Sequence, residues 1–325
     1  MTPAFAIPVV DLGSFTRGGR TERQQAARAF GRAFEEGGFV TIVGHGVPAG
    51  LVRSTYATLR DFFALPEGVK RRYTAPERAK GRGYLPMRIE SVAATLTGVT
   101  PPDLCEALVF ASLQRERSGA GLPNFWPQEP AALAGQVNAY FDAMLGLCGQ
   151  LMELSALALD LPEGYFAPYF EQPSLTLRFV NYPDQPEPPE EGQLRYGAHH
   201  DYGGLTILRQ DEAPGGLQIC DAAGRWHDVP PHPDSFVINV GDLMARWTNG
   251  RWRSTLHRVV NPDRALTGST QRLSMVAFTG PHGATEIAAL PSCTGPDHPP
   301  RFAPVNAQAY VQAKVAASHD LPPPR

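Results

Sequence analysis

Apolar residues recur every three or four positions through much of the first half of the chain, which is the spacing of a helix with one buried face. This spacing predicts a helix over residues 21–36, with Thr21 as the N-cap and Gly37 as the stop. It also predicts helices over residues 49–66 and 130–159. The last is the longest helical pattern in the chain, and its apolar face is wide enough to back a sheet.

Two strand-like stretches accompany these helices. Residues 7–12 ("IPVVDL") predict a short strand, and residues 39–48 ("FVTIVGHGVP") predict a strand that runs into a Gly/Pro turn. Between residues 74 and 126, Gly and Pro are frequent and periodicity is weak, which predicts an irregular connection laid over a core. Such connections often cover binding sites.

From Ser174 onward the pattern changes to short β-type runs separated by turns, which is typical of a sandwich or barrel. After them, residues 302–320 predict a helix capped by Asn306, and residues 321–325 ("LPPPR") have the composition of a disordered end. The β-type runs are "LTLRFVNY", "LTIL", "GLQIC", "SFVINVGD", "LHRVV" and "RLSMVAF".

Composition excludes several classes of protein. With 325 residues, 42% of them hydrophobic, the chain can bury a large core. Its 29 basic and 32 acidic residues are spread along the chain, so we expect neither a nucleic acid nor a membrane partner. The amino terminus lacks the pattern of a signal peptide and no long apolar run occurs, so a cytoplasmic protein is expected. The four cysteines form no CxxC pair and suggest neither a zinc knuckle nor a disulfide framework.

The stretch "GAHHDYGG" contains the strongest candidate for chemistry. Residues two apart in a strand share a face, so His199 and Asp201 would project together and His200 would project away, into a packing or orienting role. In isolation such a pair is more often a surface turn. A third ligand is offered by His257 in "STLHRVV". Two imidazoles and one carboxylate on one side of an ion leave the other side open, which suits non-haem Fe(II).

The sequence stretches around these residues, and others along the chain, resemble those of a known family. It is similar over nearly its whole length to the iron- and 2-oxoglutarate-dependent dioxygenases of the isopenicillin N synthase-like family. The stretches that carry the resemblance are "IPVVDL", "GGFVTIVGHGVP", "GRGYLP", "PPDLCEAL", "NFWP", "GAHHDYGGLTILRQD", "GGLQI", "VINVGDLMARWTNGRWRSTLHRVV" and "RLSM".

The resemblance implies a mainly β fold with α elements, a distorted double-stranded β-helix (jelly roll) with helices packed outside it. On this basis residues 1–125 form an N-terminal mixed α/β region packed on the core. Residues 126–325 contain the long helix, the jelly-roll core at about residues 173–284 and the C-terminal helix. The two parts are expected to form one compact unit.

The resemblance also implies a set of cofactors and ligands. Fe(II) would be bound by His199, Asp201 and His257, and 2-oxoglutarate and O2 would be cosubstrates. The family's R-x-S motif, which binds the far carboxylate of 2-oxoglutarate, falls on Arg272 and Ser274. A tyrosine that hydrogen-bonds the same molecule falls on Tyr182 and would complete the cofactor-binding set. A planar guanidinium suits this role because it can bind both carboxylate oxygens at once.

Two further residues are candidates for substrate binding. Arg178 shares strand parity with Tyr182, and a buried arginine needs a counter-charge. That charge would come either from an anionic substrate or from an acidic residue of the protein such as Glu106. Phe278, on the strand after Ser274, either lines the substrate space or belongs to the core.

The expected function is oxidation of a C–H bond of a small-molecule substrate in specialised metabolism. Hydroxylation is favoured, and desaturation or cyclisation would use the same oxidant. Two alternatives remain open at this point. One is a family oxidase that uses O2 without 2-oxoglutarate; the other is a metal-binding barrel without redox chemistry, such as a zinc hydrolase, an isomerase or a binding protein.

Overall fold

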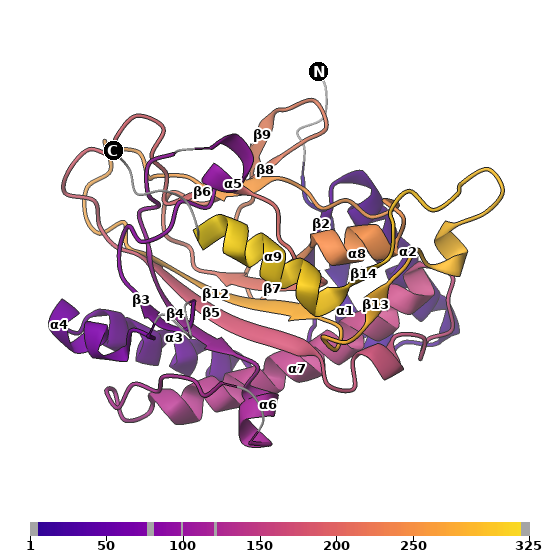
Figure 1. Ribbon diagram of the computed structural model, residues 1–325, viewed down its shortest axis with the longest axis horizontal. Coiled ribbons are helices and arrows are strands. Elements are labelled where there is room, and N and C mark those ends of the chain that lie inside the picture. Colours follow the sequence, from indigo (N-terminus) through magenta and orange to yellow (C-terminus); the bar gives the residue numbers. More distant parts are fainter. Residues whose placement is uncertain (1–5, 77–80, 99, 120–121, 320–325) are drawn as a thin grey trace.

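Two β-sheets form the centre of the molecule in the computed structural model, which describes residues 6–76, 81–98, 100–119 and 122–319 (Figure 1). The larger sheet has the strand order β1-β2-β10-β7-β12-β5-β4-β3 and is antiparallel except where β1 pairs with β2. Its strands are β1 (Val9–Asp11), β2 (Phe39–Val43), β3 (Gly83–Leu85), β4 (Glu106–Ala111), β5 (Ser174–Tyr182), β7 (Leu205–Gln210), β10 (Phe236–Val240) and β12 (Arg272–Gly280).

The smaller sheet is antiparallel, with the order β6-β11-β8-β9. Two clusters of buried apolar side chains join the sheets: one contains Val180 and Val259, and the other contains Val237 and Ile219. The sheets therefore face each other across a common interior, which confirms the jelly roll. The strands of the smaller sheet are β6 (Tyr196–His199), β8 (Leu217–Cys220), β9 (Trp226–Asp228) and β11 (His257–Val259).

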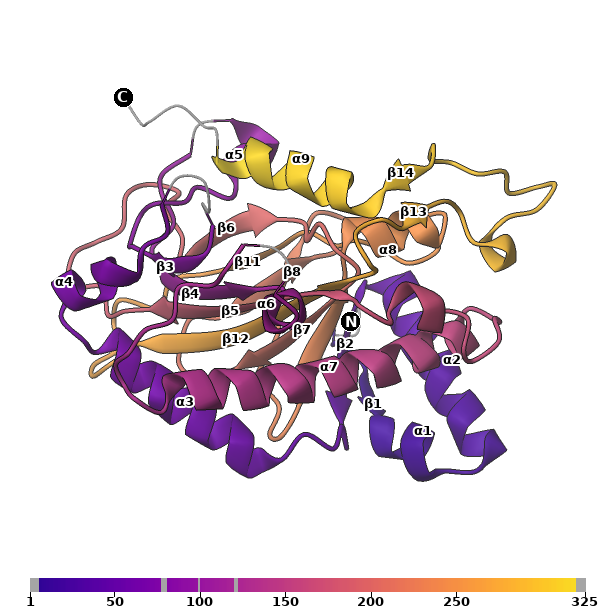
Figure 2. The same ribbon diagram turned by 60° about the horizontal axis from the view of Figure 1, so that its bottom comes forward.

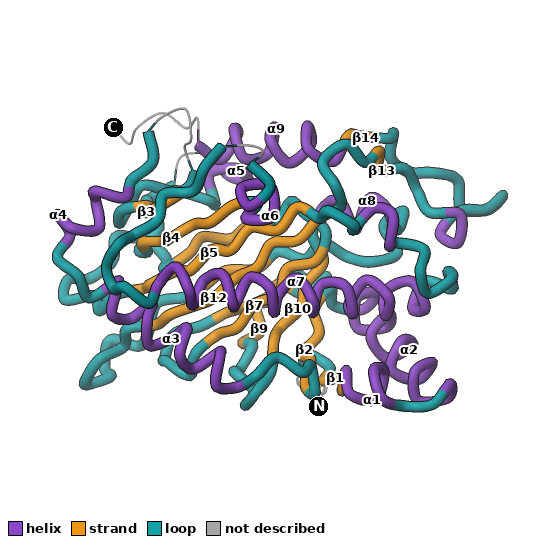
Figure 3. The backbone as a smooth tube through the Cα atoms, turned by 90° about the horizontal axis from the view of Figure 1, so that it is seen from below, coloured by secondary structure: helices purple, strands orange, loops and turns teal. Residues whose placement is uncertain are grey.

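Three helices cover the outer face of the larger sheet, as Figure 3 shows for α3 and α7. Alternate residues of β5 explain this layer: Leu175, Leu177 and Phe179 are fully buried in the main core, and the ring centroid of Phe179 lies 6.1 Å from that of Tyr140 on α7. The residues between them face the interior of the jelly roll. The three helices are α2 (Arg20–Glu36), α3 (Ala49–Phe63) and α7 (Leu133–Ala158).

The C-terminal helix α9 lies on the opposite side of the larger sheet from α7, as Figure 2 shows. Among the described helices, none is both long enough and apolar enough to cross a membrane. The remaining elements are α1 (Leu12–Arg17), α4 (Glu67–Lys70), α5 (Ala94–Thr97), α6 (Leu113–Arg117), α8 (Asp242–Trp247), α9 (Ala307–His319), the short strands β13 (Glu286–Ile287) and β14 (Val305–Asn306), and 3₁₀ turns at Arg71–Tyr73, Ala167–Tyr169 and Pro291–Cys293.

Most elements expected from the hydrophobic pattern are present. The long helix, the two N-terminal strands and all six β-type runs of the second half are confirmed. The C-terminal helix follows Asn306, whose Oδ1 accepts a hydrogen bond from the Ala309 N–H at 3.0 Å, so this cap is confirmed as well. Residues 321–325 lie outside the described residues. The division of the chain after residue 125 stays a prediction, although β1 to β4 are strands of the same sheet as β5.

Two predictions about the first half are wrong. The irregular region of residues 74–126 contains β4, which pairs with β5 along its whole length inside the larger sheet. Its residues Glu106 to Phe110 are all buried, so it lacks the alternation by which a half-exposed strand is recognised. The helix predicted to be capped by Thr21 begins at Arg20, with Gly19 at the N-cap and no side-chain capping hydrogen bond.

Candidate metal centre and substrate cavity

Three side chains meet where the smaller sheet ends. His199 is the last residue of β6 and His257 the first of β11, and the two are direct partners in the antiparallel pairing. Asp201 follows two residues after β6. Its Oδ1 lies 3.6 Å from Nε2 of His199 and 3.7 Å from Nε2 of His257. These three residues, all buried, are a group that could hold a metal ion, with ligand atoms within 4.8 Å of one another.

Main-chain contacts select which imidazole nitrogen faces the centre. Nδ1 of His199 lies 2.9 Å from the carbonyl oxygen of Gly197, and Nδ1 of His257 lies 3.0 Å from that of Thr255. A carbonyl oxygen can only accept, so each Nδ1 carries the proton and each Nε2 keeps its lone pair. Both imidazoles are therefore prepared to bind a cation through Nε2.

The carboxylate of Asp201 is held in a similar way. Its Oδ2 accepts hydrogen bonds of 2.6 Å from Oγ1 of Thr206 and of 2.6 Å from Nδ2 of Asn239. Its main-chain oxygen accepts from the Asp242 N–H at 2.7 Å. With Oδ2 occupied, Oδ1 is the oxygen directed at the imidazoles, which suits a ligand that binds through one oxygen.

The protonation states agree with metal binding. Burial alone would raise the pKa of Asp201, but the His257 and His199 imidazoles and the Thr206 hydroxyl hold the pKa of this carboxyl well below its usual range. Burial, together with the charge of His199, lowers the pKa of His257 to about 4. A carboxylate and a neutral imidazole are the forms that bind a metal, so near neutral pH no proton has to leave these two residues.

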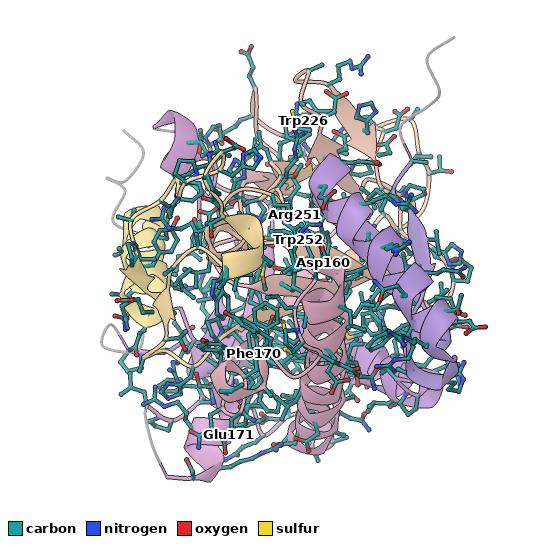
Figure 4. All side chains as sticks on the ribbon, turned by 90° about the vertical axis from the view of Figure 1, so that its right-hand side faces the viewer. Asp160, Phe170, Glu171, Trp226, Arg251 and Trp252 are labelled. Atoms are coloured by element: carbon teal, nitrogen blue, oxygen red, sulfur yellow. The ribbon has the colours of Figure 1, made fainter. Side chains whose placement is uncertain are left out.

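The segment before β11 is anchored far from the centre. Trp252 is fully buried, with its ring centroid 4.9 Å from that of Phe34. Arg251 pairs with Glu35 at 2.7 Å and with Asp160, just after α7, at 3.7 Å (Figure 4). These contacts fix the approach of the chain to His257 against two of the covering helices.

His200 takes no part in this group of three. Its Nδ1 lies 3.0 Å from the carbonyl oxygen of Ser254, whose hydroxyl donates to Oδ1 of Asp242 at 2.8 Å. The side chain also lines the large cavity described below. The alternation of side chains along a strand predicted that His200 would point away from the metal-binding group. Strand β6 ends at His199, however, so this alternation does not fix the direction of the residues that follow.

The three residues expected to bind 2-oxoglutarate share the inner face of the larger sheet. Arg272 of β12 lies directly opposite Tyr182 of β5, and Ser274 lies two residues along β12. All three are buried. Among the described residues, neither the Tyr182 nor the Ser274 hydroxyl has a hydrogen-bond partner. Two hydroxyls without a protein partner beside a guanidinium fit the far carboxylate of 2-oxoglutarate, which can accept all of these donors.

Arg272 is held by neutral groups more than by charge. Its Nη2 donates to Oε1 of Gln210 at 2.7 Å and its Nη1 to the carbonyl oxygen of Ala213 at 3.1 Å. The Asp211 carboxylate comes no closer than 3.6 Å. The guanidinium is thus oriented by the protein without a close carboxylate partner.

A cavity of about 900 Å³ opens beside the metal-binding group. It is bounded by β5, β6, β12, the irregular region and α9. Arg178 and Phe278, the two candidate substrate-binding residues, both line it. Other lining residues include Arg82, Glu90, Arg115, His199, His200, Asp201 and Gln308.

Arg178 has an acidic partner, but it is not Glu106. Nη1 and Nη2 of Arg178 donate to Oε1 and Oε2 of Glu90 at 3.1 and 2.5 Å. Glu106 pairs across the strands with Asn181, so it lies on the opposite face of the sheet from Arg178, and it binds Lys70 at 2.7 Å. Strand register therefore overturns the prediction of a Glu106 partner. Tyr196 links Arg178 to the metal-binding group, since its ring centroid lies 5.4 Å from Cζ of Arg178 and 4.9 Å from the His199 ring.

Several residues of the site were not predicted from the sequence. Asn239 could have been identified, because it is the one amide in the apolar run "FVINV" and a buried amide needs a hydrogen-bond partner. Thr206 and Glu90 carried none, because a threonine in a strand and a glutamate in a loop are common.

Comparison with known proteins agrees with this geometry. The family model described as the 2OG-Fe(II) oxygenase superfamily matches residues 172–281, and that of the non-haem dioxygenase in morphine synthesis N-terminal region matches residues 7–129. A 2-oxoglutarate-dependent dioxygenase of Aspergillus niger is 32% identical over 97% of this chain and 94% of its own. Validamycin A dioxygenase of Streptomyces hygroscopicus is 30% identical over 89% and 81%.

Solved structures show the same likeness. A full-length Neurospora crassa protein in complex with alpha-KG and thymine superposes with a TM-score of 0.84 at 27% identity, covering 97% of this chain and 98% of that one. A putative 2OG-Fe(II) oxygenase family protein from Caulobacter crescentus gives a TM-score of 0.80 at 28% identity, covering 95% and 98%. The chain belongs to the 2OG-Fe(II) oxygenase superfamily. It is an Fe(II)- and 2-oxoglutarate-dependent dioxygenase with O2 as the second cosubstrate.

Proposed function

We propose that the enzyme hydroxylates a C–H bond of a small-molecule substrate, with iron bound by His199, Asp201 and His257. The convergence of two Nε2 atoms and one Oδ1 atom carries this assignment, because every other polar atom of these side chains already has a partner. Such a set binds a cation from one side and leaves the other side for exchangeable ligands.

The cosubstrate site falls on Tyr182, Arg272 and Ser274. The hydroxyls of Tyr182 and Ser274 and the guanidinium of Arg272, on three buried side chains of the same inner face, support this assignment. They would bind the far carboxylate of 2-oxoglutarate and so aim its oxo-acid end at the metal.

When Fe(II), 2-oxoglutarate and O2 are bound, the metal supplies the oxidising chemistry, in which one oxygen atom enters succinate, CO2 leaves and the other oxygen atom enters the substrate. The residues of the chain hold, orient and shield these partners. Thr206 and Asn239 keep Asp201 in one orientation, and the Tyr196 ring covers one edge of His199. Hydroxylation requires one C–H bond to be aimed, whereas desaturation or cyclisation requires a second group to be placed as well.

The substrate would lie in the large cavity, in contact with Arg178 and Phe278. Because Glu90 already balances Arg178, that arginine alone does not call for an anionic substrate. Arg82 and Arg115 give better support for an anionic substrate. Both line the cavity, and the charge of Arg115 contributes, after burial, to a lowered pKa of Arg82. Glu116 acts on Arg82 in the opposite sense and more strongly than Arg115 does, so one carboxylate accompanies these two arginines.

We therefore propose an anionic group on the part of the substrate that faces Arg82 and Arg115. Comparison of an acidic substrate with its methyl ester should show whether the enzyme recognises a negative charge on the substrate. Arg115→Met should raise KM for the acid and leave KM for the ester unchanged. Equal effects on both would remove the support for an anionic substrate.

A role in specialised metabolism and a location in the cytoplasm stay predictions. A relative named for a small molecule, Validamycin A dioxygenase, and the Neurospora crassa structure with thymine support a small-molecule substrate.

The deciding experiment measures succinate formed per substrate consumed, with O2 uptake followed in parallel. We expect a ratio near one and a product heavier by one oxygen atom. Oxygen uptake without succinate would indicate an oxidase that does not use 2-oxoglutarate. Anaerobic addition of Fe(II) and 2-oxoglutarate should also produce a weak visible charge-transfer band, and turnover supported by zinc alone would overturn the proposal.

A further inference from the structure

A second buried arginine accompanies Arg272 inside the jelly roll. Arg195 directly precedes β6 and is completely buried. Arg272 is also almost completely buried. Cζ of Arg195 lies 5.9 Å from the ring centroid of Tyr182, which is the residue directly opposite Arg272. Arg195 leads into β6 of the smaller sheet and Arg272 belongs to β12 of the larger one, so the two arginines reach Tyr182 from different sheets. We call the region around these three residues the corner.

Neutral acceptors hold Arg195 in place. Its Nη1 donates to the carbonyl oxygen of Pro214 at 2.7 Å and its Nη2 to that of Thr270 at 2.5 Å. Within the part of the chain that the structure describes, no carboxylate forms an ion pair with Arg195. Carbonyl dipoles stabilise a guanidinium without cancelling its charge.

The corner therefore holds an excess of positive charge. Among the described carboxylates, Asp211 alone forms an ion pair with Arg272, at 3.6 Å, and its Oδ2 accepts a hydrogen bond from the Leu273 N–H at 2.7 Å. The Nε atoms of both arginines are buried without a partner. Burial, followed by repulsion from Arg272, lowers the pKa of Arg195 to about 10. Two carboxylates act on Arg195, Asp211 and Asp184, but Asp184 is exposed and accepts hydrogen bonds from Ser269 and Thr270. The two buried cations therefore outnumber the single carboxylate that lies in the interior, which leaves room there for one more negative charge.

We propose that Arg195 is a positioning residue for 2-oxoglutarate, which favours the dianion over 2-oxo acids that lack the far carboxylate by adding positive charge behind Arg272 and Tyr182. This inference rests on the proposed cosubstrate site. Arg195 does not touch the cosubstrate in this scheme; it strengthens the field in which Arg272 binds the carboxylate. In a poorly solvated interior such a field decays slowly with distance, so a neighbouring cation contributes to affinity.

A purely structural role makes a different prediction. If Arg195 only ties Pro214 and Thr270 together, its loss should weaken binding of every 2-oxo acid by the same factor. The comparison of 2-oxoglutarate with 2-oxopentanoate, which has the same five carbons without the far carboxylate, separates the two roles.

The experiment is calorimetric titration of the full chain loaded with Mn(II), without O2, using each of these two acids. For Arg195→Met we expect Kd for 2-oxoglutarate to rise about tenfold or more while Kd for 2-oxopentanoate changes less than about threefold. Arg195→Lys, which keeps the charge and loses the planar fork, should retain most of the preference. Arg209→Met is the matched control, because Arg209 also donates to carbonyl oxygens, at 2.8 Å to that of Ser235, and lies outside the corner.

Equal losses for both acids in a folded Arg195→Met variant overturn the inference. If that variant does not fold, Arg195→Lys still decides, because loss of the preference in a folded, charge-retaining variant also overturns it. Arg272→Met distinguishes this failure from failure of the proposed function. If Arg272→Met keeps the preference, the cosubstrate site itself is wrongly assigned; if Arg272→Met loses it and Arg195→Met does not, only the role of Arg195 is wrong.

Discussion

His199 and His257 are direct partners across β6 and β11, with ring centroids 4.1 Å apart, although they lie 58 positions apart in the sequence. Backbone hydrogen bonding between strands thus sets the distance between the two imidazoles before any metal binds. A centre built in this way should lose its metal without losing its fold.

Asp201→Ala should abolish iron binding and turnover while the far-ultraviolet circular dichroism spectrum remains that of the wild type. Removing the carboxylate leaves the Thr206 hydroxyl and the Asn239 amide without their acceptor, at a cost of roughly 1–3 kcal/mol of stability. Metal content after dialysis against Fe(II) measures the effect, and exposed Asp61→Ala serves as the control. Near-normal activity of Asp201→Ala would show that these three residues are not the iron site.

Thr206→Val and Asn239→Leu should each weaken Fe(II) binding about 10- to 100-fold, because each removes one of the two donors that orient Asp201. Thr55→Val is the matched control for Thr206→Val, since Thr55 is also buried and its hydroxyl donates within α3 at 2.8 Å, outside the site. Competition with a coloured chelator gives the affinity. An unchanged Kd in both variants would mean that the orientation of Asp201 is set elsewhere.

Lys70→Met should destabilise the fold strongly. The Glu106 carboxylate is buried and accepts hydrogen bonds from Lys70 at 2.7 Å, Tyr84 at 2.5 Å and Asn181 at 2.8 Å, so loss of the lysine leaves a buried charge without a cation. We expect a loss of about 3–5 kcal/mol in the free energy of unfolding, measured with denaturant. The double variant Lys70→Met, Glu106→Leu should cost less than the sum of the single changes, and strict additivity would argue against the pair.

Asp103→Asn should flatten the dependence of stability on pH. Asp103 accepts hydrogen bonds from the Val92 and Gly197 N–H groups, and burial raises its pKa to about 7 from an ordinary value of 3.8. Between these values the folded state holds a proton that the unfolded state has released, so the free energy of unfolding falls as pH rises, by at most about 1.4 kcal/mol per pH unit.

The asparagine cannot titrate, so its stability deficit should be largest near the lower of these pKa values and should shrink as pH rises toward the higher one. Denaturant titrations across this pH range provide the measurement, and exposed Asp61→Asn should follow the wild-type profile. Identical pH profiles for Asp103→Asn and the wild type would show that Asp103 does not titrate in this range.

Local patterns predicted the fold well wherever an element has a clear period or an uninterrupted β-type run. The helix α7 and the strand β5 were predicted because their apolar positions repeat with a fixed period. Strand β4 was missed because it lies in a region rich in Gly and Pro, where no period marks an element. Arg178 was correctly expected to need a counter-charge, but its partner Glu90 lies 88 positions away in the irregular region, where no periodicity fixes the geometry.

The sequence by itself determined the ligand types: two residues of the metal-binding group two positions apart in "HHD", a third in "LHRVV", and the Arg-x-Ser pair on one strand face. Spacing along one strand is a short-range property, set by backbone geometry alone. The tertiary structure decided which atoms meet. Strand register brought His257 to His199, gave Asp201 the donors Thr206 and Asn239, and put Glu106 on the wrong side of the sheet for Arg178, because such contacts depend on how distant segments pair.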